Sequence, residues 1–381
     1  PWEQRKLGEY ACKIQRTYEE SSAPIMMITS EGGFIEQSRR YSFNNAGKSL
    51  KKYILLYKGE LAYNHGASKL RPYGSCFSLE HQESARVPYV YHCFSVSGHN
   101  AVFFSYLLNL SSIQKELRKL VSSGTRQDGL LNISFEQYCS VPIKVPTKEE
   151  QQKIATLFQE LERDITLHQR KVESVKKLKK SLLQKMFPKE GETVPAIRFP
   201  GFTDAWEQRA FGNIAIRLSS LSNKSDLPRV EYADIISGEG RLNKDIYAKE
   251  RVKPGVEFKR GQVLYGKLRP YLQNWLLPTF SGIAVGDFWV LEPKKLDSQF
   301  LYYLIQAPTF SSISNLSVGT KMPRADWKLI SQASFRVPSF SEEQQKIGRF
   351  LSDLDSLITL HQRKVETLKK LKKALLQRMF I

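Results

Sequence analysis

The chain has 381 residues, enough for two or three domains that each bury an apolar core. Its hydrophobic content of 41% and charged content of 25% are typical of a folded soluble protein. The formal net charge of +20 is unusual and favours a polyanionic partner, with nucleic acid first and an acidic membrane surface second. The longest apolar runs are too short and too interrupted to span a bilayer, which excludes transmembrane helices, and residues 1–10 do not form a signal peptide.

Short strands are predicted in the first hundred residues. Segments rich in Tyr, Phe, Ile and Val, broken by Gly, Ser and Asn, are typical of short strands and loops. They lie at residues 24–29, 51–59 and 87–96. Residues 100–110 and 113–121 then have the apolar density and the helix-forming residues of a helical patch.

A long helix is predicted to follow. Pro142 and Pro146 keep the preceding backbone extended, and Thr147 with Glu150 forms a capping box. Apolar residues then recur in steps of four and three from Ile154 onward, which predicts a coiled-coil seam. At about 1.5 Å per residue this helix would be roughly 58 Å long, so it needs a partner along its length.

The sequence of this helix returns near the end of the chain. Residues 149–187 and 342–380 share 26 identities over 39 aligned positions at a constant offset of 193. Chance does not produce such a match, so the chain consists of two related halves, and each helix has its own repeat as the obvious antiparallel partner. The predicted seam residues are Ile154, Phe158, Leu161, Ile165, His168, Val172, Ile347, Leu351, Leu354, Ile358, His361 and Val365. The stripe is predicted to continue through Val175, Leu178, Leu182 and Met186, and through Leu368, Leu371, Leu375 and Met379.

Histidines and cysteines leave alternatives open. His168 and His361 occupy equivalent seam positions, and buried residues that fix the register of the helix pair are favoured over a metal site or a pH switch. The four cysteines all lie in the first half without a C-x-x-C motif, which argues against a disulfide frame or a structural zinc common to both halves. His92, Cys93 and His99 could be metal ligands, but loop and core residues are favoured.

The second part of each long helix is strongly basic. Residues 170–185 contain seven Lys or Arg and one acidic residue, and residues 363–378 repeat these numbers. A solvated polar face is one interpretation, and a face that meets an acidic partner or the DNA backbone is the other. A role toward a protein partner is favoured over direct DNA contact.

A linker at residues 188–201, with several Pro and Gly, leads into the second half. The segment DAWEQRAFGN at residues 204–213 echoes the first residues, PWEQRKLGE, so the first half is expected to begin partway into its own copy. Landmarks at a predicted helix start also recur in spacing: Asn100, Phe103, Tyr106 and Leu107 match Asp297, Phe300, Tyr303 and Leu304. We therefore predict the same fold twice, with near-identical helices and divergent globular domains.

Two small motifs inside the globular parts suit DNA contact. KLRPY follows a Gly-led strand in both halves; its Lys and Arg can meet phosphates or guanine edges, and its Pro stiffens the loop. A G-T-[KR] loop follows later in each half. A structural turn whose Leu and Tyr pack in the core is the alternative for KLRPY. The predicted DNA-binding residues are Lys69, Arg71, Tyr73, Thr125, Arg126, Lys267, Arg269, Tyr271, Thr320, Lys321 and Arg324.

Motifs of catalysis are absent from the sequence. It contains no G-x-x-x-x-G-K-[ST], G-x-S-x-G or H-E-x-x-H, and no Asp/Asn-Pro-Pro-aromatic tetrapeptide of amino-methyltransferases. The Gly-containing segments at residues 30–34 and 237–241 are interpreted as turns between strands. We therefore predict a binding protein with no catalytic and no metal-binding residues.

With these motifs in place, the chain closely resembles the specificity subunit of type I restriction–modification systems over its whole length. The resemblance rests on FPGFTDAWEQRAFG at residues 199–212, on GQVLYGKLRPY at residues 261–271, and on the long helices that close with Q-[KR]-M-F. It implies an α+β fold in which two similar α/β target-recognition domains are joined by two long helices in an antiparallel coiled coil, as a pseudo-twofold repeat. The implied segments are the first target-recognition domain at residues 1–145, the central helix at 146–190, the linker and second target-recognition domain at 191–337, and the C-terminal helix at 338–381.

The resemblance implies a non-catalytic subunit of a restriction–modification complex. Each target-recognition domain would recognise one half of a split, non-palindromic site in double-stranded DNA, and the helices would set the spacing and bind methyltransferase subunits. Half-sites about one helical turn, or roughly 34 Å, apart would put both domains on one face of the duplex. A basic coiled-coil adaptor that binds acidic partners, or DNA without sequence specificity, is the alternative function.

The same resemblance implies the partners and their cofactors. Two copies of the modification (methyltransferase) subunit and the restriction (motor and nuclease) subunits would join the chain, and no membrane is involved. The methyl donor, ATP and Mg²⁺ would be bound by those partners and none by this chain. The expected location is the cytoplasm of a bacterium or an archaeon.

Overall fold

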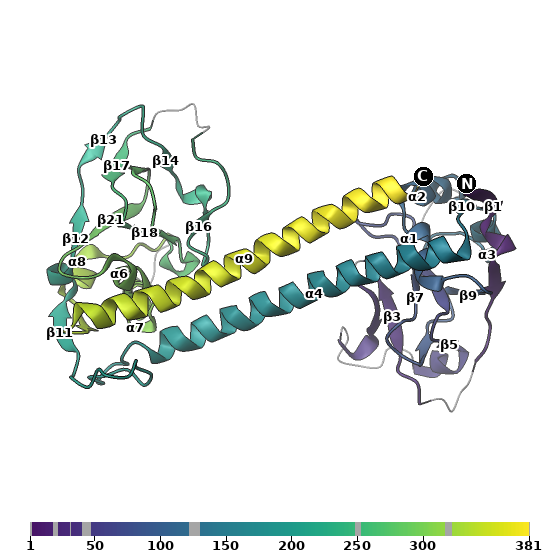
Figure 1. Cartoon of the computed structure of the whole chain (residues 1–381), viewed down its shortest axis with the longest axis horizontal. Coiled ribbons are helices and arrows are strands. Elements are labelled where there is room, and N and C mark those ends of the chain that lie inside the picture. Colours follow the sequence, from purple (N-terminus) through teal and green to yellow (C-terminus); the bar gives the residue numbers. More distant parts are fainter. Residues whose placement is uncertain are drawn as a thin grey trace. The chain divides into compact units, whose positions relative to one another are not determined.

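The computed structural model describes residues 2–17, 22–30, 32–39, 47–121, 130–247, 253–316 and 322–380. The chain forms two compact units, the first made of Pro1–Thr166 with Glu366–Ile381 and the second of Leu167–Val365. Two long unbroken helices, α4 (Lys148–Lys185) and α9 (Ser341–Met379), contribute residues to both units (Figure 1). The predicted α+β class and the two repeated long helices are confirmed, whereas the domain boundaries from the sequence stay a prediction.

The first unit is built from short strands with three short helices before α4. Strands β2, β9, β6 and β7 form a four-stranded antiparallel sheet in that order, and β3–β4, β5–β8 and β1–β10 form antiparallel pairs. Residues of β6 are buried because this strand lies inside the sheet. The elements are β1 (Glu3–Lys6), β2 (Ala11–Lys13), β3 (Met26–Thr29), β4 (Gly33–Glu36), β5 (Ile54–Tyr57), β6 (Leu61–Asn64), β7 (Ser75–Ser78), β8 (Ser84–Val87), β9 (His92–Val96), α1 (Ala101–Leu108), α2 (Ser111–Leu120), α3 (Phe135–Cys139) and β10 (Pro142–Val145).

The second unit follows a similar plan, with several strands of only two residues. Its four-stranded sheet has the order β12, β21, β18 and β19, a second sheet has the order β13, β17, β20 and β14, and β11–β22 and β15–β16 are antiparallel pairs. The elements are β11 (Glu207–Ala210), α5 (Phe211–Ile214), β12 (Ala215–Leu218), β13 (Leu221–Ser222), β14 (Arg229–Val230), β15 (Ile235–Ile236), β16 (Arg241–Leu242), β17 (Gly255–Phe258), β18 (Val263–Gly266), β19 (Trp275–Leu276), β20 (Gly282–Ala284), β21 (Phe288–Pro293), α6 (Ser298–Leu304), α7 (Pro308–Ser314), α8 (Trp327–Gln332) and β22 (Ser334–Val337).

The repeated landmarks have the same structural role in each unit. The side chain of Asn100 accepts a hydrogen bond from the Phe103 amide and caps α1, and Asp297 caps α6 through the Phe300 amide. A side-chain oxygen at the N-cap satisfies an amide that has no partner inside the helix. The predicted helix starts are therefore confirmed.

The two W-E-Q-R segments also correspond. β1 pairs with β10 in the first unit and β11 pairs with β22 in the second, each just before a long helix. The Trp2 indole donates to Glu150 at 3.0 Å, and the Trp206 indole donates to Glu343 at 3.2 Å. Each tryptophan thus ties the edge of its unit to the first turn of a long helix. Thr147 also accepts from the Glu150 amide, which is one half of the predicted capping box.

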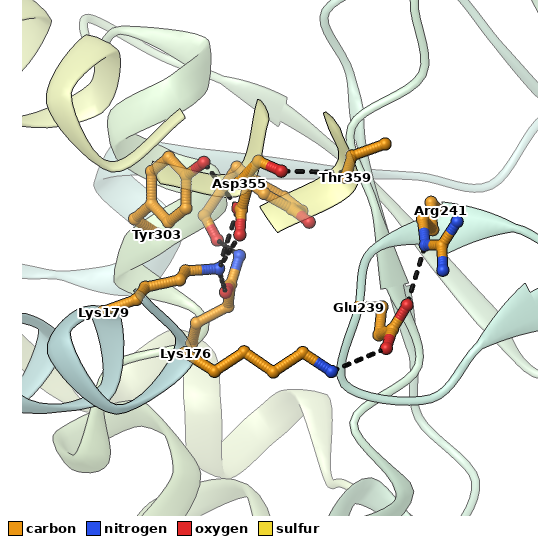
Figure 2. Close-up of polar contacts among 9 residues, drawn as sticks. Lys176, Lys179, Glu239, Arg241, Tyr303, Asp355 and Thr359 are labelled. Atoms are coloured by element: carbon orange, nitrogen blue, oxygen red, sulfur yellow. Dashed lines mark hydrogen bonds and ion pairs between the residues drawn. The ribbon is translucent and has the colours of Figure 1, made fainter. Parts of the chain in front are cut away.

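Inside the second unit, α4 and α9 run antiparallel around a polar cluster (Figure 2). The Lys179 ammonium of α4 lies 2.7 Å from the Asp355 carboxylate of α9, and the Tyr303 hydroxyl of α6 donates to the same carboxylate at 2.8 Å. The Lys179 side chain is only 12% exposed, and burial lowers its pKa although the adjacent carboxylate opposes this shift. One carboxylate therefore holds both helices and the globular part together.

The first unit contains the counterpart of this cluster. Lys372 of α9 forms an ion pair with Glu162 of α4, and its ammonium lies 5.4 Å from the centre of the Tyr106 ring of α1. Lys372, Glu162 and Tyr106 occupy the repeat positions of the lysine, the acid and the tyrosine in the second unit. The same three-residue arrangement thus occurs once in each unit.

The histidines of the predicted seam face each other between these helices. The Nδ1 atoms of His168 and His361 are 2.9 Å apart, so one nitrogen donates and the other accepts. Burial lowers the pKa of His361, and the neighbouring His168 and Lys171 lower it further. The contact agrees with the interpretation of a polar pair that fixes the register.

Most of the predicted stripe is buried, with one correction. Ile154, Phe158, Leu161, Ile165, Val172, Ile347, Leu351, Ile358 and Val365 are buried, and Leu354 is partly buried. Leu178 and Leu371, which were predicted to extend the stripe, are 49% and 44% exposed. Lys179 and Lys372 face the partner helix instead, since their acids lie on that helix.

Asp355→Ala should destabilise the second unit by about 2–3 kcal/mol, because it leaves the buried ammonium of Lys179 and the Tyr303 hydroxyl without their acceptor. Denaturant unfolding of the full chain measures the change. Asp353→Ala, on the exposed side of the same helix, is the control and should change the free energy of unfolding by less than about 0.5 kcal/mol. Equal effects of the two substitutions would contradict the assigned role of Asp355.

Candidate nucleic-acid interface

In the second unit the KLRPY loop follows directly on β18 and is fixed by main-chain bonds. The Arg269 amide donates to the Pro323 carbonyl at 2.7 Å, and the Ala325 amide donates to the Lys267 carbonyl at 2.8 Å. The structure therefore brings KLRPY beside residues 322–325, the segment that follows the second G-T-[KR] motif in the sequence.

The cations at the base of this loop share one carboxylate. Arg324 donates to Asp287 through two nitrogens, at 3.3 and 3.2 Å, and the Lys267 ammonium lies 3.6 Å from the same side chain. Two positive charges are thus partly neutralised by one negative charge. Such a cluster can still meet phosphates, but its side chains are less available for bidentate contact with a guanine edge.

The tip of the loop is apolar and exposed. Residues Pro270–Leu272 form a single 3-10 turn, η5, in which Pro270 is buried. Tyr271 is 58% exposed and Leu272 is 37% exposed. Met322, immediately before the residue that bonds to Arg269, is 47% exposed. The interior position that the alternative interpretation gave to the tyrosine is therefore not what this loop adopts.

The same five residues behave differently in the first unit. The Arg71 guanidinium donates to the Asn109 carbonyl at 2.6 Å and to the Ser30 carbonyl at 3.2 Å, and burial lowers its pKa. The Tyr73 amide donates to the Gln114 side chain at 3.0 Å. These contacts favour the structural interpretation for Arg71 and Tyr73. Lys69, Leu70 and Pro72 are the exposed members of this motif.

Four of the predicted DNA-binding residues, Thr125, Arg126, Thr320 and Lys321, lie outside the described residues. The segment after the first G-T-[KR] motif is described. Leu130 forms a bridge with Gly66, and the Leu131 amide donates to the His65 carbonyl at 2.9 Å. In the first half, too, the segment after the G-T-[KR] motif lies beside the residues that precede KLRPY.

The contacts of these histidines and cysteines favour structural roles. His92 contacts the Ile133 carbonyl at 2.8 Å, and burial lowers its pKa; burial also raises the pKa of Cys93. His99 contacts Gln151 at 3.1 Å. All four cysteines are free thiols. In the part of the chain that the structure describes, no three His, Cys, Asp or Glu side chains come together as a metal site.

Among the described residues, no helix combines the length and the apolar content that crossing a bilayer requires.

Sequence reasoning missed the residues that attach the helices to the globular parts. Tyr106 and Tyr303 were noted only as repeated landmarks, and the acids that accompany them, Glu162 and Asp355, were not singled out. The signal was available, because both acids occupy one repeat position and both matching lysines, Lys179 and Lys372, occupy another. A search for repeated charges inside the apolar stripe would have found them.

Arg71→Met should lower the stability of the first unit by about 2 kcal/mol, since two backbone carbonyls lose a charged donor. The thermal unfolding of the full chain tests this. Lys69→Met, an exposed residue of the same motif, is the matched control and should leave the unfolding midpoint unchanged. An Arg71→Met chain that keeps its midpoint and loses DNA affinity would instead support the DNA-contact interpretation.

Comparison with known proteins agrees with this architecture. The family model described as the type I restriction modification DNA specificity domain matches residues 29–177 and 271–370. The type I restriction enzyme EcoDI specificity subunit of Escherichia coli is 26% identical over 172 residues, which cover 43% of this chain and 38% of that protein. The MjaVIII specificity subunit of Methanocaldococcus jannaschii is 22% identical over 288 residues, which cover 67% of this chain and 65% of that protein. The chain thus spans less than two thirds of the length of either relative.

Solved structures share the fold over the whole chain. The S subunit of a type I restriction-modification system from M. genitalium has a TM-score of 0.63 at 13% identity, covering 100% of this chain and 96% of that one. A chain from a study of complex assembly and conformational transition in the type I R-M system has a TM-score of 0.51 at 16% identity, covering 100% and 97%. Since the family model matches well over half of the residues in two separate segments, the chain belongs to the type I restriction–modification DNA specificity family.

Proposed function

We propose that this chain is the DNA-recognition subunit of a type I restriction–modification complex, and that each of its two units recognises one half of a bipartite, non-palindromic site. The observation that supports this most is the contrast between the KLRPY loops. Both units place the motif directly after or close behind a strand inside the four-stranded sheet, yet the exposed side chains differ. They are Lys69, Leu70 and Pro72 in the first unit, and Tyr271 with the adjacent Leu272 in the second. Two units with a similar fold and different exposed loop residues suit two different half-sites.

The charge of the chain supports DNA as the ligand. A net charge of +20 supplies salt-sensitive attraction to phosphates, which contributes affinity without sequence information. Side chains at loop tips would add the discrimination between bases. The alternative of a basic adaptor shares the attraction and lacks the discrimination, so sequence preference is what separates the two functions.

The long helices also offer an exposed face for a protein partner. On α4, Leu167 and Leu178 are 47% and 49% exposed and lie three turns apart on one side of the helix. Their repeats on α9, Leu360 and Leu371, are 62% and 44% exposed. Lys171 is exposed between the two leucines of α4. We assign these repeated faces to two copies of the methyltransferase subunit, since each face occurs once per helix.

Part of the basic run is not available to such a partner. Lys176 bonds to Glu239 at 3.0 Å and Lys179 bonds to Asp355, so these cations serve the structure of the second unit. Arg170, Lys177 and Lys180 are exposed. The exposed remainder supports a role in meeting an acidic surface of the partner.

Catalysis is assigned to the partners in this proposal. The methyltransferase subunits would bind the methyl donor, and the restriction subunits would bind ATP and Mg²⁺ and cleave DNA, while this chain binds no cofactor. We place the complex in the cytoplasm, where it has access to the genome. The spacing between the half-sites stays a prediction.

Exchange of residues 1–145 for the first domain of another family member should change one half of the methylated sequence and leave the other half unchanged. Methylated positions are mapped in a genome where the chain is expressed with its methyltransferase partner. The matched control exchanges residues 191–337 and should change only the opposite half. If one exchange alters both halves, or if methylation follows no sequence, the proposal that each unit recognises one half-site fails.

Leu167→Glu with Leu178→Glu should reduce the methyltransferase that co-purifies from two copies per chain to one, because two charges enter the apolar contact on α4, which must lose water, while the repeated face on α9 is unchanged. The helix should persist, since Glu is a good helix former. Leu221→Glu, at a residue that is 76% exposed on β13, is the control for an added charge elsewhere. Retention of two copies by the double variant would contradict the assignment of this face as a docking site.

A further inference from the structure

The backbone at the ends of the η5 turn is strained. Arg269 and Gln273 adopt left-handed conformations, with φ of 48° and 57°, although neither is glycine. Among the described residues only Lys295 shares this property outside glycine. Such conformations cost about 1–2 kcal/mol each and persist where the surrounding structure determines them. Two of them on either side of one turn indicate a turn that is held in a chosen shape.

Hydrogen bonds from three directions hold that shape. The Arg269 amide donates to the Pro323 carbonyl at 2.7 Å, and the Gly238 amide donates to the Gln273 carbonyl at 3.0 Å. The Tyr232 hydroxyl donates to the Leu268 carbonyl at 2.5 Å. The turn is therefore rigid before any ligand binds, which reduces the entropy that binding would cost.

This rigid turn presents an apolar tip rather than a charged one. Tyr271 and Leu272 are exposed at its outer side, while Lys267 and Arg324 at its base are both engaged by Asp287. The cations can attract phosphates without leaving that cluster. The apolar tip can contact base surfaces, because every base offers a π-face and thymine offers a methyl group.

We propose that Tyr271 and Leu272 are specificity-determining residues that contact bases of the half-site recognised by the second unit. The inference rests on the proposed function and goes beyond it by naming the side chains and the kind of contact. The cations at the base of the turn bind the backbone of the same duplex. In the first unit the corresponding loop instead exposes Leu70, which is 58% exposed, and Pro72, and this different surface would suit a different base preference.

The test maps methylated positions for the full chain with its methyltransferase partner. Tyr271→Ala with Leu272→Ala should relax discrimination at one or two base pairs of a single half-site by at least about fivefold, the lower range for a lost base contact. The other half-site should stay unchanged. The control is Tyr247→Ala with Leu221→Ala, which removes two comparable exposed side chains from the same unit and should preserve the whole sequence.

Each result bears on one of the two proposals. If the wild-type chain directs bipartite methylation and the variant Tyr271→Ala with Leu272→Ala still requires every base of the wild-type sequence, the inference about Tyr271 and Leu272 is overturned and the proposed function stands. If the tip variant methylates all sites more weakly without any change in sequence, Tyr271 and Leu272 contact only the backbone and the inference is again overturned. If the wild-type chain directs no sequence-dependent methylation, the proposed function itself fails.

A second variant guards against a folding defect. Tyr271→Phe keeps the ring and should retain the wild-type sequence preference, and thermal unfolding of every variant verifies the fold. Should the double variant unfold, Tyr271→Ser alone is decisive, because a side chain that is 58% exposed contributes little to the core. Unchanged discrimination in a folded Tyr271→Ser chain would overturn the assignment of Tyr271.

Discussion

The constraint on which the structure depends is that, in each unit, a lysine on one long helix must pair with an acid on the other long helix. The Lys179 side chain is only 12% exposed, and a buried ammonium without a partner is costly, so Lys179 requires Asp355. The matching Lys372, which is 25% exposed, pairs with Glu162 in the same way. An apolar seam alone would tolerate slips by one heptad, whereas these pairs form in one register only. The register in turn brings a tyrosine from the adjacent globular part, Tyr303 in the second unit, onto the same acid.

This arrangement explains why an apparently solvated basic run recurs almost unchanged. Some of its lysines serve the structure: Lys179 is mostly buried and contacts Asp355 of the other helix, and Lys176, which is 40% exposed, contacts Glu239 of the globular part. Leu178 and Leu371, which the heptad count placed in the seam, are exposed instead. The lysine that follows each of them, Lys179 or Lys372, faces the other helix. At this repeat position a charged side chain faces the other helix and a leucine is exposed, which is the reverse of the usual amphipathic pattern. It leaves a repeated apolar face on helices that are already paired.

Much of the fold could be predicted from the sequence because the repeat supplies its own control. Helix starts at Asn100 and Asp297 follow from capping chemistry and spacing, and both are observed. The candidate site was harder to predict, since a motif such as KLRPY gives the residue types but not which of their side chains are exposed. Arg71 bonds to the carbonyls of Ser30 and Asn109, and no local rule brings those residues to it. Contacts across such sequence distances depend on how the whole unit folds.

The residues before the motif decide which side chains it exposes. In the second unit a single Gly266 joins strand to loop, and a Cβ there would lie 2.4 Å from the Tyr232 hydroxyl, so only glycine fits. In the first unit five residues take its place, and His65 among them contacts the carbonyls of Leu131 and Val90. After the longer connection the Arg71 guanidinium donates to the carbonyls of Ser30 and Asn109, whereas after the short one Arg269 adopts a left-handed backbone. One conserved motif can therefore present different surfaces when only its approach changes, and a duplicated chain can acquire two recognition specificities without altering the helices that join them.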